Sequence, residues 1–248
     1  MHHVRFNFLS SALPMLLATS LTSCDDDAQA SPTSLQEGAD PSPEAIKLDA
    51  GGEPFADLAV FFEFNSTDND LGLQVFLDAE DWDRVVARSP AGKKILDFAA
   101  RKEMAELGIT ELRFESAEPS PAEVLAIFQP GAYVFAGRTV EGEPLYGTAD
   151  LSSALPPAAV FTPADGDEVD AANTVIEWVP IGGLAGYEVI VSNEDNGLSM
   201  TVELGPAATI LHVPAEFMTP DAEYKTEVLT IALNGNKTIA EHVFTSAP

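Results

Sequence analysis

The segment NTVIEWVPIGGLAGYEVIV, residues 173–191, decides the fold of the C-terminal part of this chain. Its first six residues alternate in character, so Thr174, Ile176 and Trp178 fall on one face of an extended strand. A glycine-rich loop follows, and the alternation resumes from Tyr187. Two short alternating segments separated by turn residues are typical of an all-β sandwich.

The same pattern extends outward from this segment to residues 157–248. Asn196-Gly197 predicts a tight hairpin turn, and a last hairpin is predicted around Asn234-Gly235-Asn236. Several short strands at regular spacing, each bounded by turn residues, indicate one complete sandwich rather than an isolated hairpin.

Three aromatic landmarks in this region carry a family resemblance. Trp178, Tyr187 and the run Met218-Thr219-Pro220-Asp221-Ala222-Glu223-Tyr224 resemble a fibronectin type III domain, in which such a run forms the tyrosine corner. The resemblance covers residues 157–246. It implies a β-sandwich that serves as a spacer or adhesive module, and it implies no chemistry, because function belongs to sites and not to folds.

The central region, residues 53–155, predicts a second β-rich domain. A closing hairpin around Tyr133 looks like the last two strands of an immunoglobulin-like module, and Ser120 with Pro121 predicts a short capped helix. The region resembles an uncharacterised family of exported bacterial proteins, a likeness that brings no activity. Strands are expected at residues 58–62, 73–77, 83–88, 111–115, 131–137 and 145–149. The predicted fold is therefore all-β, with two tandem immunoglobulin/fibronectin-like β-sandwiches, the second spanning residues 156–248.

Cys24 is the one cysteine of the chain and ends the run Leu21-Thr22-Ser23-Cys24. This run follows a basic and then apolar N-terminus, and it resembles the lipobox of bacterial lipoproteins. The resemblance implies a signal peptide at residues 1–23, cleavage before Cys24, and a diacylglycerol on its thiol. Residues 24–52 lack aromatic residues and predict a flexible, disordered linker. The alternative is an ordinary cleaved signal with an incidental cysteine.

These features place the expected protein in the cell envelope, attached to a membrane through the lipid on Cys24 and facing outside the cytoplasm. Whether it faces the periplasm or the cell surface stays open. The formal net charge is −28, which repels phosphates and so disfavours nucleic acid as a partner. An extracytoplasmic protein or glycan is the expected partner.

Calcium is the one cofactor that the sequence suggests. Asn65, Asp68, Asp70 and Asp78 offer the hard oxygen ligands that calcium takes. The pattern is not an EF-hand, because Ala79 stands at the twelfth position, where a bidentate glutamate belongs. The alternative is an ordinary polar turn between strands, where Asn and Asp are common.

Trp82 lies between two aspartates, and we expect it to be exposed and able to stack on a sugar ring. Glu111, Glu115 and Glu118 could supply paired carboxylates for glycoside hydrolysis, but the sequence contains no recognisable catalytic motif. We therefore expect a non-catalytic, lipid-anchored display or interaction protein. The alternatives are a calcium- or carbohydrate-binding accessory protein and, less favoured, a hydrolase.

Overall fold

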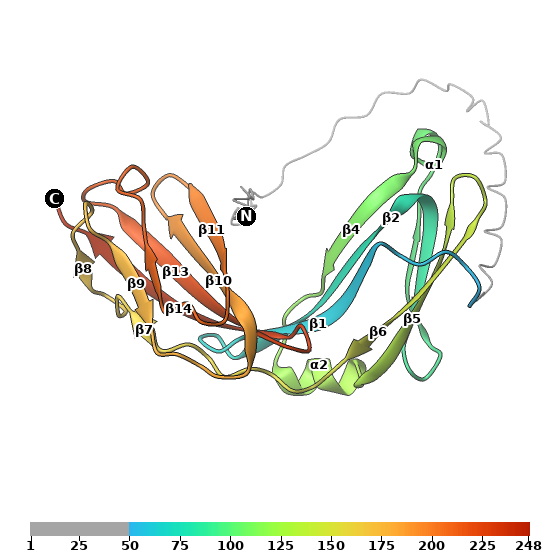
Figure 1. Cartoon of the computed structure of the whole chain (residues 1–248), viewed down its shortest axis with the longest axis horizontal. Helices are drawn as coiled ribbons and strands as arrows, with labels where there is room; N and C mark the ends of the chain where they lie inside the picture. The colour runs from blue at the N-terminus through green and yellow to red at the C-terminus, as the bar shows by residue number, and fades with distance from the viewer. Residues whose placement is uncertain (1–49) are drawn as a thin grey trace, which may run out of the picture. The chain divides into compact units, whose positions relative to one another are not determined.

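The computed structural model describes residues 50–248, which consist mainly of β-strands with two short helices (Figure 1). The prediction of an all-β fold with two tandem sandwiches is confirmed by this architecture. The expected signal peptide, Cys24 and all but the end of the expected linker lie outside the described residues. Among the described residues, no helix is long and apolar enough to cross a bilayer.

The first sandwich contains six strands and both helices. Its core contains Phe62, Trp82, Phe135 and Tyr133, each with 0% of its surface exposed. The elements in chain order are β1 (Asp57–Asn65), β2 (Asp70–Arg88), β3 (Lys94–Ala99), α1 (Glu103–Leu107), β4 (Ile109–Glu115), α2 (Pro121–Ile127), β5 (Gly131–Thr139) and β6 (Pro144–Leu151).

The long strand β2 belongs to both layers of this sandwich. Its first part pairs with β1 and β4, and its second part pairs with β3 and β5. The register shifts between Asp78 and Trp82, where a bulge bends the strand from one layer into the other. The sequence predicted two separate strands here. One strand forms because Ala79 and Trp82 continue the buried face across the bend.

The second sandwich consists of two facing sheets. One sheet has the order β12-β9-β7, and the facing sheet runs β11-β10-β13-β14. The strands are β7 (Phe161–Thr162), β8 (Glu168–Val169), β9 (Val175–Trp178), β10 (Leu184–Asn193), β11 (Ser199–Leu204), β12 (Ile210–His212), β13 (Glu223–Ala232) and β14 (Lys237–Ser246). Trp178 packs against Tyr187 between the sheets, with ring centroids 5.2 Å apart.

Each sandwich contains a buried tyrosine whose hydroxyl binds nearby backbone. The Tyr224 hydroxyl accepts a 2.6 Å hydrogen bond from the Thr219 amide, as the tyrosine corner requires. The Tyr133 hydroxyl donates to the Gln129 carbonyl at 3.0 Å. These bonds satisfy the polar end of a ring that is otherwise enclosed in apolar side chains.

The two sandwiches share a sheet, because β1 of the first pairs in parallel with β14 of the second (Figure 1). The paired residues are Glu63–Asn65 and Lys237–Ile239, and we call this contact the β1–β14 seam. The described residues accordingly fall within one compact unit, although they contain two separate apolar cores.

Candidate functional site

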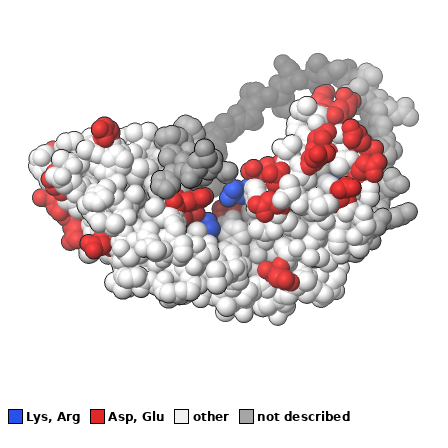
Figure 2. Space-filling model, viewed as in Figure 1, with Lys and Arg blue, Asp and Glu red and all other residues white. Residues whose placement is uncertain are grey.

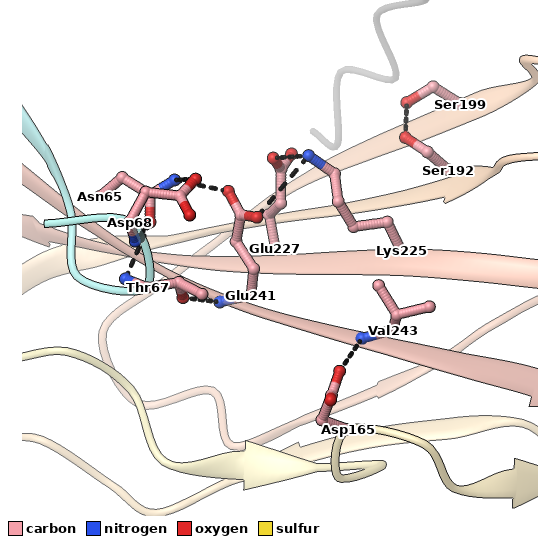
Figure 3. A network of polar contacts seen from close by, with 10 residues as sticks. All are labelled: Asn65, Thr67, Asp68, Asp165, Ser192, Ser199, Lys225, Glu227, Glu241 and Val243. Carbon is pink, nitrogen blue, oxygen red and sulfur yellow. Dashed lines mark hydrogen bonds and ion pairs between the residues drawn. The ribbon is translucent and has the colours of Figure 1, made fainter. Parts of the chain in front are cut away.

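Three of the four predicted calcium ligands lie at the β1–β2 hairpin: Asn65 ends β1, Asp68 is in the turn and Asp70 begins β2. The Asn65 side-chain oxygen accepts hydrogen bonds from the amides of Thr67 and Asp68, at 2.9 and 3.3 Å. Its amide nitrogen donates to Glu241 at 2.7 Å and to Asp68 at 3.3 Å (Figure 3). Asn65 thus closes the turn and binds β14, which is the local role that asparagine commonly has in turns.

Asp70 lies opposite Asn65 in the β1–β2 pairing and is half-buried. One of its carboxylate oxygens is inaccessible to solvent and has no hydrogen-bond partner. Burial raises the pKa of Asp70, and the neighbouring charge of Asp68 raises it further. Asp68 and Asp70 are therefore close enough to repel each other.

Asp78 does not belong to the same site, which corrects the predicted set of four ligands. It lies eight residues beyond Asp70 in the continuous strand β2. A strand rises about 3.3 Å per residue, so the two backbones are roughly 26 Å apart. Asp78 lies instead opposite Asp57 and Glu111.

The expectation that Trp82 is exposed is also wrong. Its side chain lies in the core of the first sandwich with 0% of its surface exposed, and its ring packs edge-on against Phe98 at 5.7 Å. The flanking aspartates suggested an exposed loop, but Trp82 occupies the bulge of β2 and faces inward. A ring in this position cannot stack on a sugar.

Three carboxylates meet beside the seam, and we call Glu63, Glu115 and Glu118 the carboxylate cluster. One carboxylate oxygen from each lies within 4.8 Å of the other two. Gln74 donates to Glu115 at 2.8 Å and to Glu63 at 3.4 Å. Oxygens at this spacing are the ligands that a hard cation takes, so these three residues could hold one.

Glu63 is the most buried member of the carboxylate cluster, with 16% of its side chain exposed. Burial is the largest cause that raises the pKa of its carboxyl from 4.5 to about 7. Lys237 opposes this shift, whereas three neighbouring carboxylates add to it: Glu115, Glu188 and Glu118. Burial also raises the pKa of Glu118, and Glu115 adds to that shift.

Two lysines lie among the acids on the sheet of the second sandwich. Lys237 contacts Glu188 at 2.7 Å and Glu63 at 3.9 Å. Lys225 contacts Glu227 at 2.7 Å and Glu241 at 3.9 Å (Figure 3). On the face shown in Figure 2, the few basic side chains in view lie among acidic ones. The lysines therefore offset only part of the local negative charge.

The carboxylate cluster differs from the acidic group that the sequence suggested. Glu115 and Glu118 do come together, but Glu111 lies farther along β4, opposite Asp78. Glu63 was missed because it lies between Phe62 and Phe64 in a segment that reads as a buried strand. The one available signal was the alternation of the strand, which places Glu63 on the face opposite to Phe62.

Comparison with known proteins gives only distant likenesses. No protein-family model and no curated protein matches the sequence. A two-domain fibronectin type III segment of chicken tenascin is 13% identical, with a TM-score of 0.31, covering 77% of this chain and 98% of the tenascin chain. The FN1–FN3 domains of chicken CNTN1 are 15% identical, with a TM-score of 0.30, covering 79% and 66% of the respective chains.

The class of the protein thus follows from its own strand order and tyrosine corner. The described residues form a fibronectin type III-like β-sandwich protein, in which the second sandwich contains the tyrosine corner and the first sandwich precedes it in the chain. Such a fold leaves the activity open, because the same architecture hosts many unrelated functions.

Proposed function

We propose that this chain is a non-catalytic, lipid-anchored interaction protein that displays its two sandwiches outside the cytoplasm. The run Leu21-Thr22-Ser23-Cys24 supports the anchor, with a diacylglycerol on Cys24 and residues 24–52 as the tether. The fibronectin type III-like architecture supports a binding or spacing role. The partner is a protein rather than a nucleic acid, given the net charge of −28.

An apolar face on the second sandwich carries the binding part of this proposal. Val160, Val179 and Ile210 are 71%, 59% and 44% exposed. The Val179 amide donates to the Val160 carbonyl, which places these two residues side by side. Ile210 pairs with Glu177, and Val179 directly follows β9, where exposed Glu177 and Val179 alternate with buried Trp178 and so lie on the same outward side. We call these three residues the apolar face.

Exposed apolar side chains grouped on one face of a sheet mark interaction surfaces more often than scattered ones do. Ile210 lies in β12 of the three-stranded sheet, whereas Val160 directly precedes β7 and Val179 directly follows β9. The apolar face is thus on the side of this sheet opposite the one that Ile176 and Trp178 bury in the core. A partner with apolar side chains would bury it, and the nearby Glu177 would favour a basic group at the rim.

The binding part is tested by capture from intact cells with the full tethered chain as bait. Val179→Glu should abolish the capture of any partner that wild type retains. Leu233→Glu is the matched control, because Leu233 is 80% exposed but lies in the β13–β14 turn. A captured protein that both variants retain equally does not use the apolar face, and this result would refute that part of the proposal.

The anchoring part is tested separately by mass spectrometry of the exported protein. We expect the mature chain to begin at Cys24 with a thioether-linked diacylglycerol, and Cys24→Ala to release the protein from the membrane fraction. An unmodified thiol in the mature protein would refute the proposed anchor. The proposed role of the apolar face would be unaffected, because the capture experiment tests it separately.

A second candidate function, cation binding, is favoured by the spacing of the carboxylate cluster. Calorimetry with calcium chloride tests it directly. Uptake at millimolar concentration should be lost in Glu115→Gln and kept in Glu111→Gln, since both residues are exposed on β4 but only Glu115 lies in the cluster. The absence of heat with wild type would end this candidate.

A further inference from the structure

We propose that the β1–β14 seam makes the two sandwiches unfold as one cooperative unit, together with Asn236, which directly precedes β14 at the end of the seam. The inference depends on neither the lipid anchor nor the apolar face. Cooperative unfolding accounts for the hydrogen bonds that side chains of the second sandwich make to the backbone of the first sandwich and of the connection between the two.

Asn236 is completely buried, and its side chain binds two separate parts of the chain, β1 and the connection between the sandwiches. Its side-chain oxygen accepts a 2.8 Å hydrogen bond from the Phe62 amide in β1. Its amide nitrogen donates to the Ser152 carbonyl at 2.7 Å and to the Ala154 carbonyl at 2.9 Å. The Phe62 N–H and the two carbonyls together fix the orientation of the Asn236 side-chain amide. Only Asn satisfies all three groups from this position.

The connection between the sandwiches is held in the same way by threonines. Thr238 donates to the Pro156 carbonyl at 2.7 Å, and Thr230 donates to the Pro157 carbonyl at 2.9 Å. Both threonines are at most 1% exposed. Linkers between independent domains are commonly exposed and make few contacts. Here the linker carbonyls are bonded inside the fold, which restricts movement of one sandwich against the other.

The seam continues beyond Asn236 along β14. The amide and hydroxyl of Ser66 both donate to the Ile239 carbonyl, at 2.9 and 2.6 Å. The Glu241 amide donates to the Thr67 hydroxyl at 3.0 Å, and the Glu241 carboxylate accepts from Asn65. Unfolding either sandwich alone would break these hydrogen bonds and expose the atoms of Asn236 to water, so the remaining sandwich would lose the stabilisation that the seam provides, which couples the two unfolding events.

The chain carries its own probes for this coupling. Trp82 and Trp178 are its only tryptophans, and each lies in the core of a different sandwich, 0% and 3% exposed. Fluorine NMR of the full chain labelled with 5-fluorotryptophan then reports both sandwiches at once during urea unfolding. Trp82→Phe and Trp178→Phe serve only to assign the two resonances.

In wild type, we expect the two native resonances to disappear with the same midpoint. In Asn236→Ala, the midpoints should separate by about 1 M urea, because three buried groups lose their partner. Asn193→Ala is the matched control. Asn193 is 1% exposed and makes three side-chain hydrogen bonds, all within the second sandwich, so both resonances should shift together.

Separate midpoints in wild type would overturn the proposal. So would coincident midpoints in Asn236→Ala, because that variant would then behave like the control. If Asn236→Ala does not fold, Thr238→Val removes one linker bond with little change in shape. In Thr238→Val, a separation of the two midpoints that is smaller than the one expected for Asn236→Ala supports the coupling. Coincident midpoints in Thr238→Val count against it.

Discussion

The Tyr224 hydroxyl takes part in three hydrogen bonds inside the second sandwich. It accepts from the amide of Thr219 and from the side chain of Asn193, and it lies 3.4 Å from the Phe217 carbonyl. The ring itself is 0% exposed and stacks on Phe244 at 5.6 Å. The phenol therefore fixes a loop, a strand and the core with one side chain.

Tyr224→Phe should lower the free energy of unfolding by about 1–3 kcal/mol, because two buried donors lose their acceptor while the packing stays. Urea denaturation measures the change. Tyr146→Phe is the control: Tyr146 is half-buried on β6, and its loss of the hydroxyl should change stability by less than about 0.5 kcal/mol. Equal effects from the two substitutions would contradict the corner's role.

Glu63 gives the molecule a pH dependence of known sign. Its pKa is about 7 in the folded chain, against an ordinary value of 4.5, so the folded state binds more protons between these limits. The free energy of unfolding therefore falls as the pH rises from about 4.5 to about 7, and the stabilisation from the protonated carboxyl is absent above that window.

Glu63→Gln should flatten this dependence and stabilise the protein at pH 8 by up to about 3 kcal/mol, since one pKa unit corresponds to about 1.4 kcal/mol. Urea unfolding in EDTA-containing buffers from pH 5 to pH 8 measures the slope. Glu203→Gln, on the exposed edge strand β11, should keep the wild-type slope. An unchanged slope in Glu63→Gln would assign the pH dependence to other groups.

At the scale of the elements, β10 begins with an irregular pairing between Leu184 and Gly186. A Cβ placed on Gly186 would lie 2.6 Å from the Leu204 carbonyl oxygen in β11, a backbone atom that cannot rotate away. Glycine is therefore required where β11 approaches this bend most closely.

Gly186→Ala should destabilise the second sandwich by about 1–3 kcal/mol, the usual cost of overpacking. Thermal unfolding followed by circular dichroism measures it. Gly182→Ala is the matched control in the preceding loop, where a Cβ would meet no atom within 4 Å. That variant should be neutral or slightly stabilising, because alanine restricts the unfolded chain. If Gly186→Ala were as stable as wild type, β11 would have to be able to move away from β10 at this point.

The strands that sequence patterns predicted well are those with local turn signals. Asn196-Gly197 and Asn234-Gly235 locate two hairpins to within a few residues, and the fold of the second sandwich could be predicted from them. β2 was divided in two because the acidic residues 78–83 resemble a turn, whereas a bulge lets the strand continue with Trp82 inside. Local composition does not distinguish a bulge from a turn, because packing on the core decides between them.

The candidate site was predicted less well than the fold. Its members come from β1, from β4 and from the segment after β4, and one sequence carries no signal for contacts between such distant segments. Glu115 and Glu118 were noticed because they are close in sequence. Glu63 was not, because its neighbours Phe62 and Phe64 dominate the pattern.

At the scale of the whole molecule, the formal net charge of −28 opposes compactness. Like charges repel across the folded surface, and salt screens this repulsion over about 8–10 Å at moderate ionic strength. Raising sodium chloride from 20 mM to 500 mM should therefore increase the midpoint of thermal unfolding by several degrees, as measured by calorimetry. A fall would mean that ion pairs such as Lys237–Glu188 outweigh the repulsion.

The seam also bears on how the chain is made. Phe62 and Asn236 are 174 positions apart, so β1 is synthesised long before its neighbour β14 exists. Until then the nascent protein carries an unprotected flank, which invites pairing with other copies. A premature stop or a proteolytic cut ahead of β14 would leave that flank permanently open, and such fragments should accumulate as aggregates rather than as a smaller folded product.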